Sequence, residues 1–224
     1  QSTKPQTLGY ALVDSPVGVV VWGACEALVV VAVFLHGWSP NSPFPLIGAY
    51  RYAAIALPMM LPSMFVLIAA ALPAESLSLT AIVRSQETLW NVLRQPLGLP
   101  LFLLTGLALT LRGPFDFADG ADLAGGTSAE DSGPARALWQ GARLAMLTAF
   151  SALAATVFLG GPIGPWLPGP IWLWLKSALV MAITVAAGAV LPRPPPSRML
   201  GLIWTVLLPL SFLHLVWTGG LALW

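Results

Sequence analysis

The chain has 224 residues, of which 57% are hydrophobic and only 8% are charged, and its formal net charge at pH 7 is +1. Soluble globular domains carry about 25% charged residues, so this composition excludes an ordinary soluble protein, and the small net charge gives no reason to expect nucleic-acid binding. The sequence predicts an all-α, polytopic transmembrane helical bundle that forms a single integral membrane domain over residues 1–224.

Six apolar segments approach the length of roughly 20 residues that a helix needs to cross a bilayer core of about 30 Å. We place these spans at residues 16–35, 47–72, 96–111, 137–159, 171–191 and 200–223. Pro58 and Pro62 predict a kink or break in the second span. Residues 74–95 are predicted to form a short amphipathic helix in the membrane interface, and the proline-rich link 192–198 cannot be helical throughout.

The connection between the third and fourth spans, residues 112–136, is the most polar part of the chain, and we call it the acidic loop. It holds five of the nine acidic residues, namely Asp116, Asp119, Asp122, Glu130 and Asp131. A loop that collects most of a membrane protein's negative charge is expected to face water or a soluble partner, so we predict a docking surface. The carboxylates lack the ligand spacing of a calcium loop, and with one cysteine and two histidines in the chain no metal site is predicted.

The lysines and arginines of the connections predict the orientation. Arg51, Arg112, Arg136, Arg193 and Arg198 lie on the same side as the acidic loop, and Lys4, Arg84 and Arg94 lie on the other. Because cytoplasmic connections carry an excess of positive residues, the acidic loop is expected to be cytoplasmic, in the plasma or inner membrane of a bacterium.

Three ionisable residues fall inside the predicted spans, where a charged group is costly and usually faces a cavity or a partner. Glu26 is either a proton-relay carboxylate or a neutral, hydrogen-bonded structural group. Arg143 and Lys176 either extend to the interface or pair with Glu26 or the acidic loop. Together these three are the candidate intramembrane proton or ion-pair residues.

Several motifs resemble the H-subunit family of bacterial complex I, the membrane component of NADH:quinone oxidoreductase that seats the peripheral redox arm. In the acidic loop these are Arg112-Gly-Pro-Phe-Asp116, Asp122-Leu-Ala-Gly-Gly126 and Glu130-Asp-Ser-Gly133, where the family has Arg-x-Pro-Phe-Asp, an acidic run and Glu-Tyr-Ser-Gly. Elsewhere they are Gly37-Trp-Ser-Pro-Asn-Ser42, Leu46-Ile-Gly-Ala-Tyr-Arg51, Trp90-Asn-Val-Leu-Arg-Gln-Pro-Leu97, Phe158-Leu-Gly-Gly161, Leu191-Pro-Arg193 and Trp204-Thr-Val-Leu-Leu-Pro-Leu210. Their order and spacing, rather than any single motif, carry the resemblance.

The resemblance implies that the acidic loop docks a peripheral redox arm and borders the quinone cavity. The residues it singles out are Arg112, Phe115, Asp116, Asp119, Asp122 and Glu130. Arg112 and Asp116 are expected to form a charge pair around Phe115, which either lines a quinone headgroup site or packs as an ordinary interfacial residue. The chain alone is expected to have no catalytic residue and to bind no cofactor. Quinone is the shared substrate, and flavin and iron–sulfur chemistry belongs to partner subunits.

The sequence differs from the family pattern at positions where the resemblance implies carboxylates that link the quinone cavity to the proton pathway. Where the resemblance predicts acidic or polar groups, the sequence has Pro58-Met59-Met60, Leu109, Arg143, Ile55 and Gly188. Helices that precede the first span in the family have no counterpart before residue 10. These departures imply impaired proton coupling, for which Glu26 either compensates or serves only as a partner of Arg143.

Two alternatives remain open from the sequence. One is the membrane anchor subunit of a membrane-bound hydrogenase or formate hydrogenlyase, which belongs to the same superfamily. The other is a non-catalytic structural membrane subunit or small transporter that keeps the helical scaffold without the proton relay. In each case the expected surroundings are membrane lipid and other membrane subunits.

Overall fold

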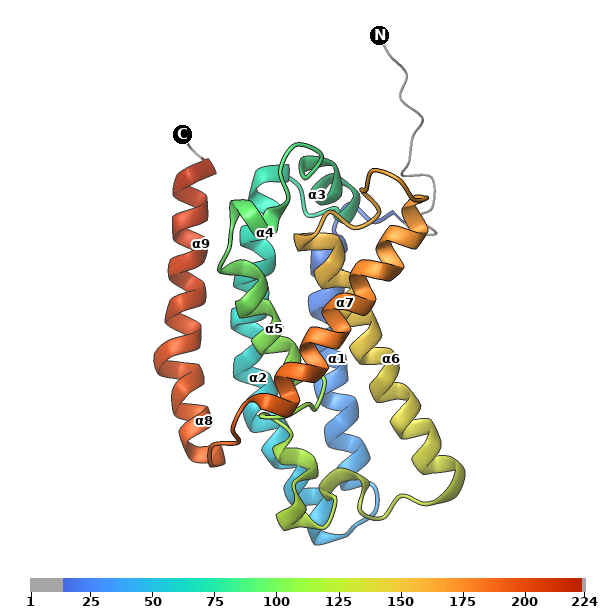
Figure 1. Cartoon of the computed structure of the whole chain (residues 1–224). Helices are drawn as coiled ribbons and strands as arrows, with labels where there is room; N and C mark the ends of the chain where they lie inside the picture. Colours follow the sequence, from blue (N-terminus) through green and yellow to red (C-terminus); the bar gives the residue numbers. More distant parts are fainter. Residues whose placement is uncertain (1–13, 223–224) are drawn as a thin grey trace.

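The computed structural model describes residues 14–222, and every regular element within them is a helix (Figure 1). Five of these helices are long and apolar enough to cross a membrane. They are α1 (Gly18–Trp38), α2 (Pro43–Ala71, continued by the turn η1, Leu72–Ala74), α6 (Gly133–Phe158), α7 (Gly169–Val190), and the run formed by α8 (Pro196–Leu202), the π-turn η5 (Ile203–Leu207) and α9 (Leu208–Ala222). The prediction of a polytopic helical membrane protein is therefore confirmed.

The third predicted span is the exception, because its helix is too short to cross a bilayer. Helix α5 covers Gly98–Leu109, only 12 residues, which at 1.5 Å per residue is about 18 Å against a core of about 30 Å. The amide of Arg112 bonds back to Leu107 O, and Leu111 adopts a left-handed conformation with φ of 56°. The helix thus ends before the predicted limit at residue 111, and the chain turns into the acidic loop.

Two further predictions differ from the structure. No break occurs in α2, which continues as one helix through Pro58 and Pro62, since membrane helices tolerate proline where neighbouring groups satisfy the freed carbonyls. Residues 74–95 form two short helices instead of one amphipathic helix, α3 (Leu79–Ser85) and α4 (Asn91–Arg94). These two helices fold over the end of the bundle.

The prediction that the proline-rich link 192–198 is not helical throughout is confirmed, because α7 ends at Val190 and α8 begins at Pro196.

Helix α2 is the central element and packs against α1, α5, α9 and the acidic loop. Its inward face carries small residues that allow close helix packing, and Ala56, Met59 and Ala70 are fully buried. Beside it, the rings of Phe102 on α5 and Phe150 on α6 stack with centroids 4.4 Å apart. The apolar core therefore lies where α2, α5 and α6 meet.

The helices alternate in direction, so that the connections with Arg51, Arg112, Arg136, Arg193 and Arg198 lie at the same end of the bundle, as the sequence predicts. Helices α1, α5 and α7 run toward the end of the bundle that holds the acidic loop, and α2, α6 and α9 run away from it (Figure 1). Arg84 and Arg94 belong to α3 and α4 at the opposite end. Lys4, which also entered the orientation argument, lies outside the described residues.

Candidate functional site

The acidic loop is folded tightly against the end of the bundle and is not an extended, water-facing segment. It forms three short turns, η2 (Phe117–Asp119), η3 (Ala121–Leu123) and η4 (Gly126–Ser128), before its last residues enter the first turn of α6. Several of its apolar and hydroxyl side chains are 4% exposed or less, namely Phe115, Ala118, Leu123 and Thr127. Phe115 and Ala118 belong to the two apolar clusters of the bundle, so the loop packs into the core of the fold.

Gly48 allows the loop to approach helix α2 this closely, and Gly126 allows two turns of the loop to pack against each other. A Cβ atom on Gly48 of α2 would lie 2.4 Å from Ala118 O, and one on Gly126 would lie 1.7 Å from the same oxygen. Gly126 also has φ of +54°, a left-handed conformation that glycine adopts at little cost. Helix α2 has 29 residues and is therefore about 43 Å long. The loop packs against its first turns.

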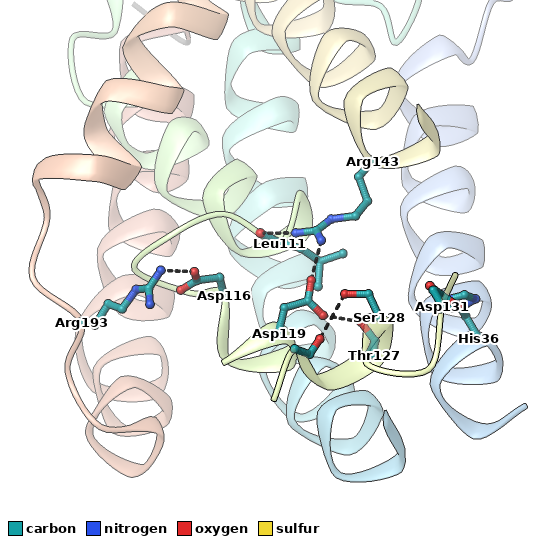
Figure 2. Close-up of polar contacts among 10 residues, drawn as sticks. His36, Leu111, Asp116, Asp119, Thr127, Ser128, Asp131, Arg143 and Arg193 are labelled. Carbon is teal, nitrogen blue, oxygen red and sulfur yellow. Dashed lines mark hydrogen bonds and ion pairs between the residues drawn. The ribbon is translucent and has the colours of Figure 1, made fainter. Parts of the chain in front are cut away.

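All four ion pairs found among residues 14–222 tie the acidic loop to the rest of the fold. They join Asp131 to His36 of α1, Asp122 to Arg51 of α2, Asp119 to Arg143 of α6, and Asp116 to Arg193 of the link between α7 and α8 (Figure 2 shows three of them). The fifth acid, Glu130, accepts a hydrogen bond of 2.8 Å from Ser42. Each acid of the loop thus has a partner within the chain.

The pair between Asp119 and Arg143 is the most enclosed of the four. The guanidinium of Arg143 donates to Asp119 Oδ2 at 2.5 Å and to the backbone oxygen of Leu111 at 3.0 Å, and Thr127 donates to the other carboxylate oxygen of Asp119 (Figure 2). The side chains of Arg143 and Asp119 are only 17% and 12% exposed. Arg143 therefore fixes both the end of α5 and the middle of the loop.

A second enclosed contact lies at the far side of the loop. His36 Nε2 is 3.0 Å from Asp131 Oδ2, and the imidazole stacks on the indole of Trp139, with ring centroids 3.7 Å apart and planes 13° from parallel. The sequence did not indicate that His36 pairs with the loop. This contact joins α1, α6 and the loop at one point.

The predicted pair between Arg112 and Asp116 is wrong. Asp116 bonds to Arg193 instead, and the structure shows no ion pair for Arg112 with any residue in 14–222. Burial, and then the neighbouring charge of Arg143, lower the pKa of Arg112. Phe115 is buried in the main apolar core, 4% exposed, which agrees with the packing alternative for this residue.

The intramembrane residues are also arranged differently from some expectations. Arg143 pairs with the acidic loop through Asp119, which was one of the alternatives left open by the sequence, and not with Glu26. Glu26 is 5% exposed and bonds to Trp22 and Ser63. Lys176 pairs with neither Glu26 nor the acidic loop, since its Nζ lies 2.6 to 3.1 Å from three backbone oxygens just after α6, those of Leu159, Gly161 and Ile163.

At the opposite end, buried amides form a cluster that the sequence analysis did not single out. Asn91 donates to Ala70 O on α2 and to Val157 O on α6 at 3.2 and 2.9 Å, and Gln86 accepts from the amides of Asn91 and Gly160. This amide cluster satisfies the carbonyls at two helix ends and fixes α3 and α4 over the bundle. Its role is structural.

Comparison with known proteins identifies the relatives of this chain. The model of the NADH dehydrogenase family matches residues 3–219. The chain belongs to this family. It is 41% identical over 213 residues to the NADH-quinone oxidoreductase H subunit 1 of Rhodopseudomonas palustris (strain HaA2), and 39% identical over 213 residues to the H subunit 2 of strain ATCC BAA-98 / CGA009. Each alignment covers 94% of this chain and 66% of the relative, so the chain spans just under two thirds of their length.

Four of the positions at which the resemblance predicts acidic or polar groups lie in packing contacts, whereas Arg143 forms an ion pair. Ile55 and Met59 are buried in the core, and so is Leu109. Gly188 of α7 lies against Gly113 of the acidic loop, where a Cβ on Gly113 would be 2.7 Å from Gly188 O. These residues pack α5 and the loop against the bundle.

Proposed function

We propose that this chain is the membrane subunit of an NADH:quinone oxidoreductase assembly of the complex I type, and that its acidic loop forms the junction with the peripheral redox arm and the quinone site. The observation that carries the proposal is the match to the NADH dehydrogenase family over residues 3–219, together with relatives that are named as the H subunit of NADH-quinone oxidoreductase. Those names favour this assignment over a hydrogenase anchor.

The geometry supports a rigid junction instead of a free anionic patch. All five acids of the loop are engaged by groups of the same chain, so they act first to hold the loop in shape. Only Asp122 and Glu130 are exposed enough to meet a second protein as well. We therefore propose that partner subunits recognise the shape of the loop, with Asp122 and Glu130 as the acids in direct contact.

In this proposal the chain binds no cofactor, and the redox chemistry belongs to its partners. Flavin and iron–sulfur groups need thiolate and nucleotide-binding motifs, and the sequence has only one cysteine, Cys25. Quinone is the shared substrate at the junction. The chain's own contribution is to position the junction relative to the membrane and to carry any proton pathway through it.

Co-purification from native membranes tests this assignment. A C-terminal affinity tag on the chain is expected to recover NADH dehydrogenase and iron–sulfur subunits after mild detergent extraction. The double variant Asp119→Asn, Arg143→Met, which loosens the loop, is expected to reduce this recovery, whereas Gly201→Ala, in an open position on α8, is expected to leave it unchanged. Recovery of hydrogenase subunits instead, or of no redox subunit at all, would overturn the proposal.

We further propose that the acidic loop faces the cytoplasm across a bacterial inner membrane. In a Cys25→Ala background, Ser132→Cys places a thiol beside the loop, and Trp166→Cys places one at the opposite end, where the native indole is 92% exposed. A membrane-impermeant maleimide added to intact cells is expected to label the second variant and to spare the first. The reverse labelling pattern would contradict the orientation.

A further inference from the structure

Glu26 is the only carboxylate within the membrane-crossing helices of the described chain, and it lies close to the middle of α1. Eight residues separate it from the first residue of α1, Gly18, which is about 12 Å along the axis. The flanking residues Cys25 and Ala27 are exposed on the outer surface of α1, whereas Glu26 is 5% exposed and points to α2. Its carboxyl group therefore lies inside the bundle and away from lipid.

The two oxygens of this carboxyl have different surroundings. Oε1 accepts hydrogen bonds from the indole Nε1 of Trp22 at 2.6 Å and from the hydroxyl of Ser63 on α2 at 2.9 Å. Oε2 is fully buried and has no hydrogen-bond partner among the described residues. This asymmetry matches a protonated carboxylic acid, whose carbonyl oxygen accepts hydrogen bonds and whose hydroxyl oxygen carries the proton.

No cation neutralises this group within residues 14–222. The nearest intramembrane cations are engaged elsewhere, Arg143 by Asp119 and Lys176 by backbone oxygens. On α2 the titratable side chain of Tyr52 donates its hydroxyl to Leu109 O at 2.9 Å and forms no hydrogen bond to Glu26. An unpaired carboxylate at this depth costs several kcal/mol or more, so the neutral form is the stable one.

We propose that Glu26, with Trp22 and Ser63, is an intramembrane proton-binding site that exchanges its proton with water at Oε2. In the forward step the Oε2–H bond breaks and the proton passes to a water molecule, which leaves a carboxylate held by the two donors on Oε1. In the reverse step a hydronium ion returns the proton. No electron transfer and no other reactant is needed.

The asymmetric contacts suit both states of this site. Trp22 and Ser63 already point at the carboxyl group and therefore stabilise the negative charge without rearrangement when the proton leaves. Oε2 is fully buried and has no hydrogen-bond partner among the described residues, so exchange with water at this atom takes place during local opening of the bundle. A role of this site in proton translocation rests on the proposed function, whereas proton binding at Glu26 does not.

Infrared spectroscopy of the full chain, purified with native lipid, tests the site directly. A protonated, buried carboxylic acid gives a C=O stretching band that is separate from the carboxylate bands. We expect this band in the native protein at pH 7 and its loss in Glu26→Gln. We also expect it to shift in Ser63→Ala to higher frequency, because that variant removes one hydrogen bond to the carbonyl oxygen.

Transfer to deuterated water separates a proton-exchanging site from a static buried acid. The band is expected to move to lower frequency as O–H becomes O–D at Oε2. Absence of the band at pH 7, persistence of the band in Glu26→Gln, or a band that stays unshifted in deuterated water for days would each overturn the proposal. If Glu26→Gln does not fold, the Ser63→Ala shift and the deuterium shift in the native chain decide the question alone.

Reaction with dicyclohexylcarbodiimide gives an independent readout, because this apolar reagent adds to protonated carboxyl groups. The carboxyl oxygen of Glu26 attacks the central carbon of the carbodiimide, and the proton passes to a carbodiimide nitrogen. Modification is expected on the peptide with Glu26 and not on exposed Glu75 or Glu87. Labelling of Glu75 and Glu87 without Glu26 would contradict the site, and failure to recover redox subunits would leave this result unaffected.

Discussion

Replacement of Arg143 by methionine is expected to destabilise the chain through the acidic loop. The substitution keeps the apolar stem of the side chain and removes the guanidinium, so Asp119 loses its ion pair at 2.5 Å and Leu111 O loses its hydrogen bond at 3.0 Å. Asp119 would then remain mostly buried as a carboxylate, with Thr127 as its one remaining donor among the described residues.

The size of the effect follows from the burial of the pair. Removing one partner of a fully buried pair costs about 3–5 kcal/mol, and because Arg143 and Asp119 are 17% and 12% exposed, we expect about 2–3 kcal/mol for this pair. For a chain of this size that corresponds to a decrease in Tm of about 4–12 °C.

Thermal unfolding in detergent micelles, followed by circular dichroism, measures this effect in a double-mutant cycle with Asp119→Asn. The two single variants and the double variant should give a coupling energy of at least about 1 kcal/mol. Arg51→Gln is the matched control, because its partner Asp122 is 60% exposed and such a pair contributes less than about 1 kcal/mol. If Arg143→Met and Asp119→Asn add within about 0.5 kcal/mol, the pair does not hold the loop and the reasoning fails.

Three other substitutions test the packing and the helix ends, each by the same unfolding assay. Gly106→Ala should lower Tm, since its Cβ would lie 2.1 Å from the ring of Phe150 and overpacking costs about 1–3 kcal/mol. Adding Phe150→Leu in a double variant should restore the Tm. Gly201→Ala, whose Cβ would have nothing within 4 Å, should not lower Tm. Lys176→Met should cost about 2–3 kcal/mol, since it leaves three carbonyls after α6 without their charged donor; an unchanged Tm would show that water replaces the ammonium. Asn91→Ala should cost about 2 kcal/mol by removing two donors between α2 and α6, and retention of native stability would mean that these carbonyls find other partners.

Much of the fold could be predicted because hydropathy fixes the position of a long apolar helix. The five long helices coincide with predicted spans to within a few residues at most ends. The short helix α5 was misjudged, because residues 96–111 are as apolar as a true span and composition does not reveal where a helix stops. The end was decided by a left-handed turn at Leu111 and by bonds from Arg143, a residue of a later helix.

For the acidic loop, the sequence indicated the position of the site but not which residues pair within it. Its importance was visible in the charge pattern, and the arginines of the same side were already grouped by the orientation argument. Their pairing was not predicted, because Arg193 is separated from Asp116 by 77 residues and His36 from Asp131 by 95. A count of charges at this end of the bundle, five acids against five arginines of the connections, would not have identified the partners, because only Arg51 and Arg193 of those arginines pair with the acids.

The contacts of the acidic loop also have an order in time during synthesis. Ribosomes add about 5–20 residues per second, so Asp116 leaves the ribosome about 4–15 s before its partner Arg193, which is 77 residues later in the chain. The partner of Asp119, Arg143, follows it by only 24 residues and is therefore synthesised much sooner. The loop is therefore held first by α1 and α2, which are synthesised before it, then by α6, and it becomes complete only after α7 has been synthesised. Under the proposed function, partner subunits that recognise the finished loop would bind only a chain whose insertion has nearly ended, which would protect against assembly on incomplete proteins.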